Sequence, residues 1–156
     1  MAKVDLKRVE AMKVVAVEHQ GPVREVGEAF SNLFSAFFRQ GLMPAGLPLA
    51  VFFAEGEEPD LENMKYWACL PVAEEAEVEA PLMYRELPAI EAASVLHQGP
   101  YDTMGEAYQA LHEWIEQEGY TIAGPPREVY VVAASPQTPV KPSDYVTEVL
   151  FPVTKA

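Results

Sequence analysis

A glutamate in an apolar strand is the feature of this sequence best suited to chemistry. Within residues 127–132 (Arg-Glu-Val-Tyr-Val-Val), strand alternation predicts that Glu128 shares one face with Tyr130 and Val132. A strand glutamate is usually solvated, so one interpretation is an exposed carboxylate at a sheet edge. The other is a pocket carboxylate among aromatic rings, which could attract a cation or act as a general base. The sequence leaves both interpretations open.

A second glutamate has a similar setting. Strand alternation over residues 145–151 places Glu148 between Val146 and Leu150 on one face. Two carboxylates therefore interrupt otherwise apolar strands in the last third of the chain, and Glu148 is the second candidate site residue.

The other reactive side chains form no familiar catalytic or metal-binding pattern. Cys69 is the single cysteine, and the three histidines, His19, His97 and His112, lack metal-ligand spacing. We interpret all three histidines as structural. The sequence also lacks phosphate-binding glycine loops, His-Glu-x-x-His and Gly-x-Ser-x-Gly. We therefore expect neither a metal nor a cofactor.

The elements that must position the two carboxylates are expected to occur twice. The motif His-Gln-Gly-Pro at residues 19–22 recurs 78 positions later, at residues 97–100. We therefore predict an internal duplication of a strand-helix-strand-strand unit. The first repeat covers about residues 4–72, a linker covers 73–80, and the second repeat covers about 81–153.

Each repeat has the same signals for secondary structure. In the first, apolar residues spaced at i, i+4, i+7, i+8 and i+11 from Val26 to Phe37 predict an amphipathic helix, with Gly41 as its left-handed C-cap. The final strand of each repeat is expected to end before a proline, Pro71 or Pro152, because proline cannot donate to a ladder. The predicted strands are 14–18, 49–54 and 65–70 in the first repeat, and 92–96, 127–133 and 145–151 in the second.

The resulting fold class is α+β, in a single domain over residues 1–156 with two pseudo-symmetric halves and antiparallel sheets. A three-stranded sheet with one helix leaves its other face uncovered, and pairing two such units would hide that surface. We therefore expect a small-molecule cleft at the seam between the halves.

The repeat also suggests what lines this cleft. Tyr130 corresponds to Phe52 and, after a three-residue slip, Glu148 corresponds to Trp67. The predicted ligand-binding residues are Glu128, Tyr130, Trp67, Tyr101, Phe52 and Glu148. Aromatic faces and an unneutralised carboxylate both attract positive charge, so this lining favours a lipophilic cation.

Charge and hydropathy exclude several classes of partner. The formal net charge of -13 repels phosphate backbones, so we expect no direct contact with nucleic acid. No apolar run approaches the roughly 20 residues that a membrane-spanning helix needs. The single cysteine and the absence of a leader pattern predict a cytoplasmic location. The sequence leaves the oligomeric state open.

These motifs resemble the GyrI-like domain, the gyrase-inhibitor family shared with the effector-binding domains of AraC-type and multidrug-sensing regulators. The resemblance spans nearly the whole chain. It is carried by residues 97–101 (His-Gln-Gly-Pro-Tyr), the helix to Trp114 and Ile115, residues 124–130, and Thr147-Glu148 running to Val153. It implies a cleft for hydrophobic, often cationic, compounds, with an acidic residue at the position of Glu128 and tyrosines around it. Because no helix-turn-helix accompanies the domain, we expect a free-standing member.

Three functions follow from this resemblance and the residues. The favoured one is sequestration or sensing of a lipophilic or cationic small molecule. The first alternative is a hydrolase, since some stand-alone members resemble enzymes that open strained cyclopropane rings; Glu128 or Glu148 would then be the catalytic general base. The second is an inhibitor that binds another protein through the acidic runs at residues 55–62 and 74–79.

Overall fold

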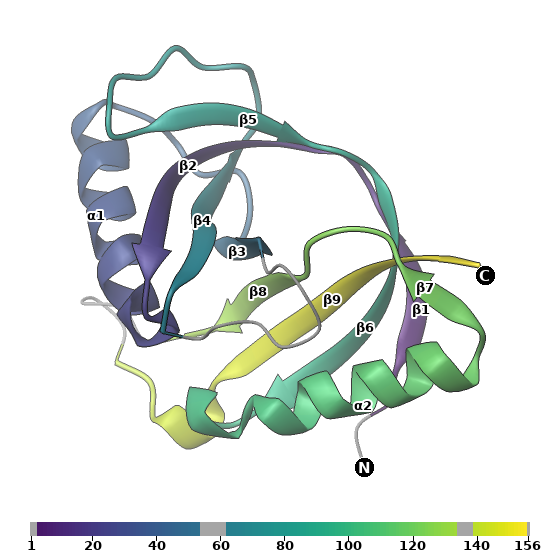
Figure 1. The fold of residues 1–156 in the computed structure, drawn as a ribbon. Coiled ribbons are helices and arrows are strands. Elements are labelled where there is room, and N and C mark those ends of the chain that lie inside the picture. Colours follow the sequence, from purple (N-terminus) through teal and green to yellow (C-terminus); the bar gives the residue numbers. More distant parts are fainter. Residues whose placement is uncertain (1–2, 54–61, 134–138, 156) are drawn as a thin grey trace. The chain divides into compact units, whose positions relative to one another are not determined.

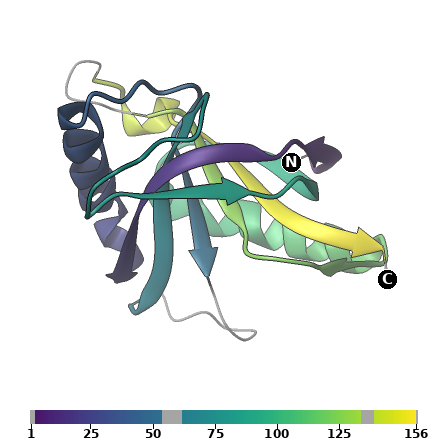
Figure 2. The same cartoon turned by 90° about the horizontal axis from the view of Figure 1, so that it is seen from above.

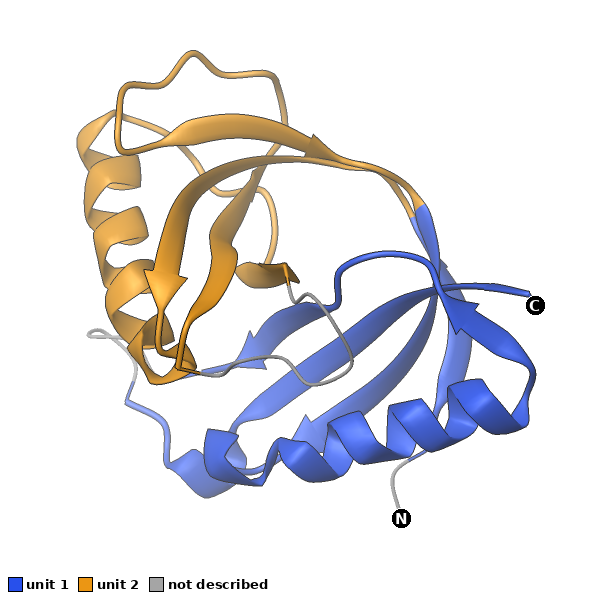
Figure 3. Cartoon of the chain, in the orientation of Figure 1, with its two compact units in different colours: residues 1–9, 90–156 blue, residues 10–89 orange. Residues whose placement is uncertain are grey.

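The computed structural model describes residues 3–53, 62–133 and 139–155 of a mixed α+β protein. The chain forms two compact units (Figure 3): unit 1 comprises residues 1–9 and 90–156, and unit 2 comprises residues 10–89. Among the helices in the described part of the chain, none has the length and apolar character to cross a membrane. Most of the acidic run at 55–62, predicted to be a solvated loop, lies outside the described residues.

Unit 1 is an antiparallel sheet with one helix packed on one face (Figures 1 and 2). The sheet order is β1 (Asp5–Val9), β6 (Ile90–Gln98), β9 (Val146–Lys155) and β8 (Arg127–Val132). A short strand, β7 (Tyr120–Ile122), pairs with the end of β9. Helix α2 (Gly105–Gln117) runs along β6 and β9 and follows a 3-10 turn at Tyr101–Thr103.

Unit 2 has the same kind of construction. Its sheet order is β5 (Met83–Leu87), β2 (Met12–Gly21), β4 (Met64–Val72) and β3 (Leu49–Phe53). Helix α1 (Val26–Arg39) packs on β2 and β4, and its buried side chains follow the predicted apolar stripe. Gly41 has a φ of 76°, as predicted for the left-handed residue that ends this helix.

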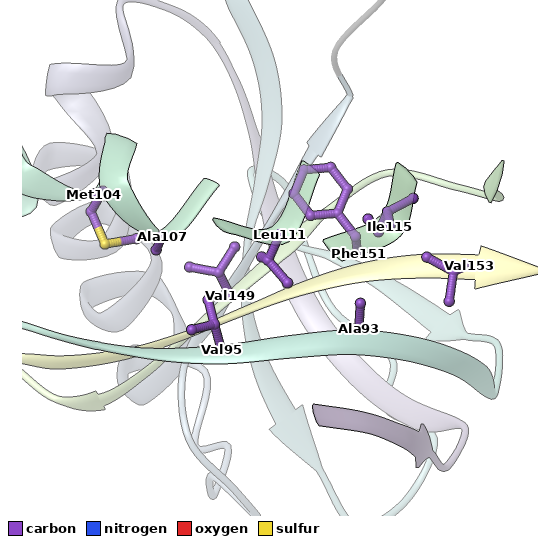
Figure 4. Packing of buried hydrophobic residues seen from close by; sticks show 9 residues of the cluster. All are labelled: Ala93, Val95, Met104, Ala107, Leu111, Ile115, Val149, Phe151 and Val153. Atoms are coloured by element: carbon purple, nitrogen blue, oxygen red, sulfur yellow. The ribbon is translucent and has the colours of Figure 1, made fainter. Parts of the chain in front are cut away.

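The core of unit 1 lies between α2 and the sheet (Figure 4). It contains apolar side chains from the helix and from the two central strands: Ala93, Val95, Met104, Ala107, Leu111, Ile115, Val149, Phe151 and Val153. The helical residues recur at three- and four-residue intervals, so they form a single stripe facing the sheet. This packing fixes which face of the sheet, and therefore which side chains, α2 covers.

The edge strands were not expected from the sequence. β1 pairs with β6, so residues 5–9 belong to unit 1, although they lie in the predicted first repeat. β5 pairs with β2, so residues 83–87 belong to unit 2, although they lie in the predicted second repeat. β1 is mostly exposed and Asp-Leu-Lys-Arg-Val lacks a strong apolar alternation, so little in its sequence predicts a strand.

The predicted strand ends at Pro71 and Pro152 were wrong. Both prolines lie inside strands, β4 and β9 respectively. The carbonyl of Pro71 accepts the Ala45 N–H at 2.8 Å, and that of Pro152 accepts the Ala123 N–H at 2.7 Å. Each proline nitrogen therefore faces an irregular segment instead of a strand that needs a donor, so the missing N–H is tolerated.

The same segments give a stability prediction. A Cβ at Gly46 would lie 3.2 Å from Pro71 Cγ, whereas a Cβ at Gly124 would lie 3.5 Å from Pro152. We expect Gly46→Ala to lower the free energy of unfolding by about 1 to 3 kcal/mol, because proline is a rigid neighbour. Gly124→Ala, the matched control, is expected to be neutral or slightly stabilising. Urea denaturation measures both; equal losses would contradict the packing described here.

Candidate ligand-binding site

Glu128 lies on the face of the unit 1 sheet that α2 covers. On β8 it pairs with Val149, a core residue, and it is half-buried. Tyr108 of α2 and Tyr130 of β8 both donate their hydroxyls to its carboxylate, one to each oxygen; the Tyr130 bond is 3.0 Å. The predicted same-face pair of Glu128 and Tyr130 is therefore present, and α2 supplies a third member.

Val132 does not share this face, contrary to the prediction. The pairing of β8 with β9 shifts between Tyr130 and Val132, so that Tyr130 pairs with Thr147 but Val132 pairs with Val146. This irregularity reverses the alternation beyond Tyr130. The sequence shows no glycine or proline that would have marked it.

Burial and hydrogen bonding act against each other on Glu128. Burial raises the pKa of its carboxyl, while the hydroxyls of Tyr108 and Tyr130, and more weakly the charge on His97, lower it. The desolvation effect is larger, so the pKa lies above the ordinary glutamate value. Burial and the neighbouring carboxylate also raise the pKa of Tyr108 and of Tyr130 well above the usual tyrosine value. Both phenols therefore remain protonated donors at neutral pH.

More tyrosines surround this cluster. The rings of Tyr101 and Tyr130 meet edge to face at a centroid distance of 6.0 Å, and Tyr101 stacks on Tyr145 at 5.0 Å. Tyr101 is 41% exposed, so part of this residue can be reached by solvent or a ligand. We call Glu128, Tyr101, Tyr108, Tyr130 and Tyr145 the Glu128 cluster.

His97 supports the cluster structurally, as expected for a repeated turn residue. Its Nε2 lies 2.9 Å from the hydroxyl of Thr103 and 3.3 Å from the carbonyl of Pro100. These contacts join the end of β6 to the turn that carries Tyr101. His19 has an analogous contact in unit 2, 2.9 Å from Glu25 Oε1.

The second predicted carboxylate, Glu148, lies on the opposite face of the same sheet. It pairs with Val129 and Leu96, whereas Glu128 pairs with Val149. Its Oε2 accepts a 2.6 Å hydrogen bond from Ser94 and lies 2.5 Å from Lys7 Nζ. Glu148 therefore has a counter-charge of its own, and it does not join Glu128 in one site within unit 1.

The two predicted aromatic residues of the first repeat lie in unit 2. Phe52 pairs with Tyr66, is 5% exposed, and packs against the Tyr66 ring at 5.4 Å. Trp67 is on the opposite face, where it meets Phe53 at 4.7 Å and donates from Nε1 to Glu18 at 3.2 Å. Phe52 and Trp67 therefore do not form one wall of a site.

Sequence reasoning missed Tyr108, Tyr145 and Thr147. Tyr108 fits the apolar stripe of α2, so the sequence gives no sign of a role in a site, although a buried phenol needs a hydrogen-bond acceptor. Thr147 is fully buried beside Tyr130, and its hydroxyl has no hydrogen-bond partner among the described residues. A polar atom buried without a partner at this position could bond a ligand.

The arrangement can hold a positive charge or move a proton. Glu128 offers a partly desolvated carboxylate, and the tyrosines offer ring faces and hydroxyl donors. Within residues 3–53, 62–133 and 139–155, no group of His, Cys, Asp and Glu side chains is placed to hold a metal ion.

Several solved structures share this fold. The crystal structure of the EcmrR C-terminal domain aligns with a TM-score of 0.84 at 24% identity, over 100% of this chain and 99% of that one. The EcmrR chain in the EcmrR–DNA complex aligns with a TM-score of 0.89 at 24% identity, over 99% of this chain and 58% of that one. The protein thus spans little more than half of the EcmrR chain in that complex.

Two more distant structures share the fold. SAV2435, solved with bound tetraphenylphosphonium, aligns with a TM-score of 0.63 at 16% identity, over 97% of this chain and 94% of that one. A hydrolase from Listeria innocua aligns with a TM-score of 0.66 at 15% identity, over 97% and 92%. No curated protein matches the sequence. The sequence profile that does match covers residues 2–154, and the chain therefore belongs to the family described as the GyrI-like small molecule binding domain.

Proposed function

We propose that this protein sequesters or senses a hydrophobic cation, and that the cation is held by the Glu128 cluster. One observation carries the proposal: Glu128 is half-buried and hydrogen-bonded only by phenols, with no Lys or Arg partner among the described residues. Glu148 provides the contrast, because Lys7 neutralises it. A desolvated carboxylate without a counter-ion favours a ligand that supplies one.

The aromatic members of the cluster support a lipophilic ligand. A cation within about 6 Å of a tyrosine ring gains about 0.5 to 2 kcal/mol from the ring quadrupole. Tyr101 is partly exposed, and Tyr130 lies beside Glu128. The bound tetraphenylphosphonium of SAV2435, a lipophilic cation, agrees with this ligand class. Tetraphenylphosphonium is therefore the probe for the first experiments.

Binding of the cation should depend on pH. The ligand favours the ionised carboxylate, and the pKa of Glu128 lies above the usual glutamate value. Affinity is therefore expected to be constant above that raised pKa and to fall as pH drops through it, by about tenfold per pH unit below it. Tyr108 and Tyr130 keep their protons throughout, because the pKa of each lies well above the usual tyrosine value.

Calorimetric titration of the wild type with tetraphenylphosphonium across this pH range measures the effect. Triphenylphosphine oxide, a neutral compound with similar rings, is the control ligand and should bind with little pH dependence. Absence of any tetraphenylphosphonium binding would refute the proposed function, and equal pH profiles for the two ligands would refute the role of charge.

Two finer sequence predictions remain part of the proposal. The location of the cleft at the seam between the repeats, with Trp67 and Phe52 among its walls, stays a prediction. Internal duplication is supported by element positions: β2 and β6 begin at Met12 and Ile90, and β3 and β8 at Leu49 and Arg127, in each case 78 residues apart. A duplicated ancestor explains why both units combine one helix with an antiparallel sheet.

A hydrolase is the second candidate, and the raised pKa of Glu128 favours it. A carboxylate tuned toward neutral pH can act as a general base, while a tyrosine hydroxyl donates a proton to the leaving group. Similarity in fold to a hydrolase from Listeria innocua agrees with this possibility. Turnover of a cyclopropane-containing electrophile by the wild type, abolished by Glu128→Gln, would favour catalysis over binding alone.

A further inference from the structure

An open strand edge in unit 2 lies beside helix α1. β2 extends from Met12 to Gly21 and pairs with β4 along nearly its whole length, but β5 pairs only with residues 12–16. Beyond Ala16, this edge of β2 has no neighbouring strand in the described parts of the chain. An unpaired edge offers backbone N–H and C=O groups to another extended segment.

The proline in β4 shows which groups face this edge. The Pro71 carbonyl accepts the Ala45 N–H on the β3 side of β4, so it points away from β2. Pro71 and its partner on β2, Val14, therefore form a pair without backbone hydrogen bonds. Val14 therefore directs its backbone groups away from β4, toward β5. Since strand residues alternate, Glu18 and Gln20 direct their N–H and C=O groups to the same side, where β5 no longer reaches.

A groove runs between this edge and α1. It has a volume of about 250 Å³, and its walls come from β2, from one stripe of α1 and from Pro81: Val17, Glu18, His19, Ala29, Asn32, Ser35, Ala36, Arg39 and Pro81. The Gln40 side chain bonds both the N–H and the carbonyl of Glu79, at 3.0 and 3.1 Å. These bonds hold the segment before Pro81 against the end of α1, so the groove is closed there.

The closed end carries a positive charge. Arg39, the last residue of α1, is exposed, contacts Ser35 at 3.4 Å, and has no acidic partner in the described residues. A segment that pairs antiparallel with β2 would run from Gln20 toward Val17 and would end beside Arg39. A chain terminus there would place its carboxylate next to the guanidinium, the pairing that arginine favours.

We infer that this groove binds the extended C-terminal segment of a partner protein by strand addition. The backbone groups of Glu18 and Gln20 would hydrogen-bond the backbone of that segment, and Arg39 would bind its terminal carboxylate. Strand addition to a sheet edge is a common mode of peptide recognition, and capture of a terminal carboxylate gives it direction. This site lies in unit 2, whereas the Glu128 cluster lies in unit 1, so each can be tested without the other.

The test uses a library of fluorescein-labelled hexapeptides, randomised at the last three positions and made both as free acids and as C-terminal amides. Fluorescence anisotropy with the whole protein should select free acids that bind at least about tenfold more tightly than their amides. Arg39→Gln should remove that preference, while Arg24→Gln, an exposed arginine outside the groove, should preserve it.

A second pair of variants tests the backbone. Gln20→Pro removes one outward N–H and should weaken the selected peptide at least about tenfold, whereas Gln20→Ala keeps the N–H and should bind normally. The amide signals of Glu18 and Gln20 should shift in NMR spectra of the wild type on peptide binding. Three results would each overturn the inference. The first is that no free acid binds with a Kd below about 1 mM, and the second is that acids and amides bind equally. The third is that Arg39→Gln keeps the preference for free acids.

Discussion

Glu128→Gln is expected to weaken tetraphenylphosphonium binding by about 1 to 3 kcal/mol, or roughly 5- to 150-fold in Kd. Glutamine has nearly the same shape and can still accept from one tyrosine and donate to the other. The substitution therefore removes the counter-charge and preserves the cluster. Binding of neutral triphenylphosphine oxide should change little, and the pH dependence of cation binding should be lost.

The stability of the same variant separates a ligand site from a structural one. Burial raises the pKa of Glu128 in the folded protein, so the folded state holds the proton more tightly than the unfolded chain. The stabilisation from that proton is complete below the unfolded pKa and is lost as pH rises through the folded pKa. At neutral pH, Glu128→Gln should therefore unfold at the same urea concentration as the wild type, or a higher one. A large loss of stability, or equal losses of affinity for both ligands, would contradict the counter-charge role.

Leu111→Ala is expected to lower the free energy of unfolding by about 2 to 5 kcal/mol. Leu111 is fully buried between α2 and the sheet of unit 1, where it lies in the cluster with Val95 and Val149 (Figure 4). Its truncation leaves a cavity that the helix and the central strands can close only partly. Urea denaturation followed by circular dichroism measures the loss.

Leu96→Ala is the matched control, with the same atoms removed from a side chain that is 62% exposed. It should change the free energy of unfolding by no more than about 0.5 kcal/mol. If Leu111→Ala cost no more than Leu96→Ala, the assigned core of unit 1 would be wrong. Both variants should leave the Tyr130 and Glu128 side chains in place, so cation binding at low temperature checks that the fold persists.

Local periodicity predicted the elements that carry the site, because it depends on residues close in sequence. The stripe from Val26 to Phe37 became α1, and the alternation around Glu128 correctly placed Tyr130 on its face. The irregularity before Val132 and the prolines inside β4 and β9 were missed. The irregularity and both prolines depend on which segment lies beside the strand in the sheet. Residues nearby in the sequence do not determine that neighbour.

The site itself was predicted only in part, for a related reason. Glu128, Tyr130 and Tyr101 were predicted to line the site, but Tyr108, which donates a hydrogen bond to Glu128, comes from a helix 20 residues earlier and was missed. A tyrosine in an apolar stripe gives no sign of whether its hydroxyl reaches solvent or a carboxylate. Conversely, the neutralisation of Glu148 by Lys7 requires β1 to pair with β6, which the sequence did not predict.

The most direct test of the central claim is to locate the cation in a crystal. Tetraphenylarsonium has the shape and charge of tetraphenylphosphonium, and its arsenic atom can be found by anomalous scattering. We predict an arsenic peak within about 6 Å of the Tyr130 or Tyr101 ring, the range of a cation–π contact, and on the Glu128 side of that ring. The peak should be absent from crystals of Glu128→Gln soaked at the same concentration. An arsenic peak elsewhere in the wild type, or an equally strong one in Glu128→Gln, would contradict the assignment of this cluster as the cation site.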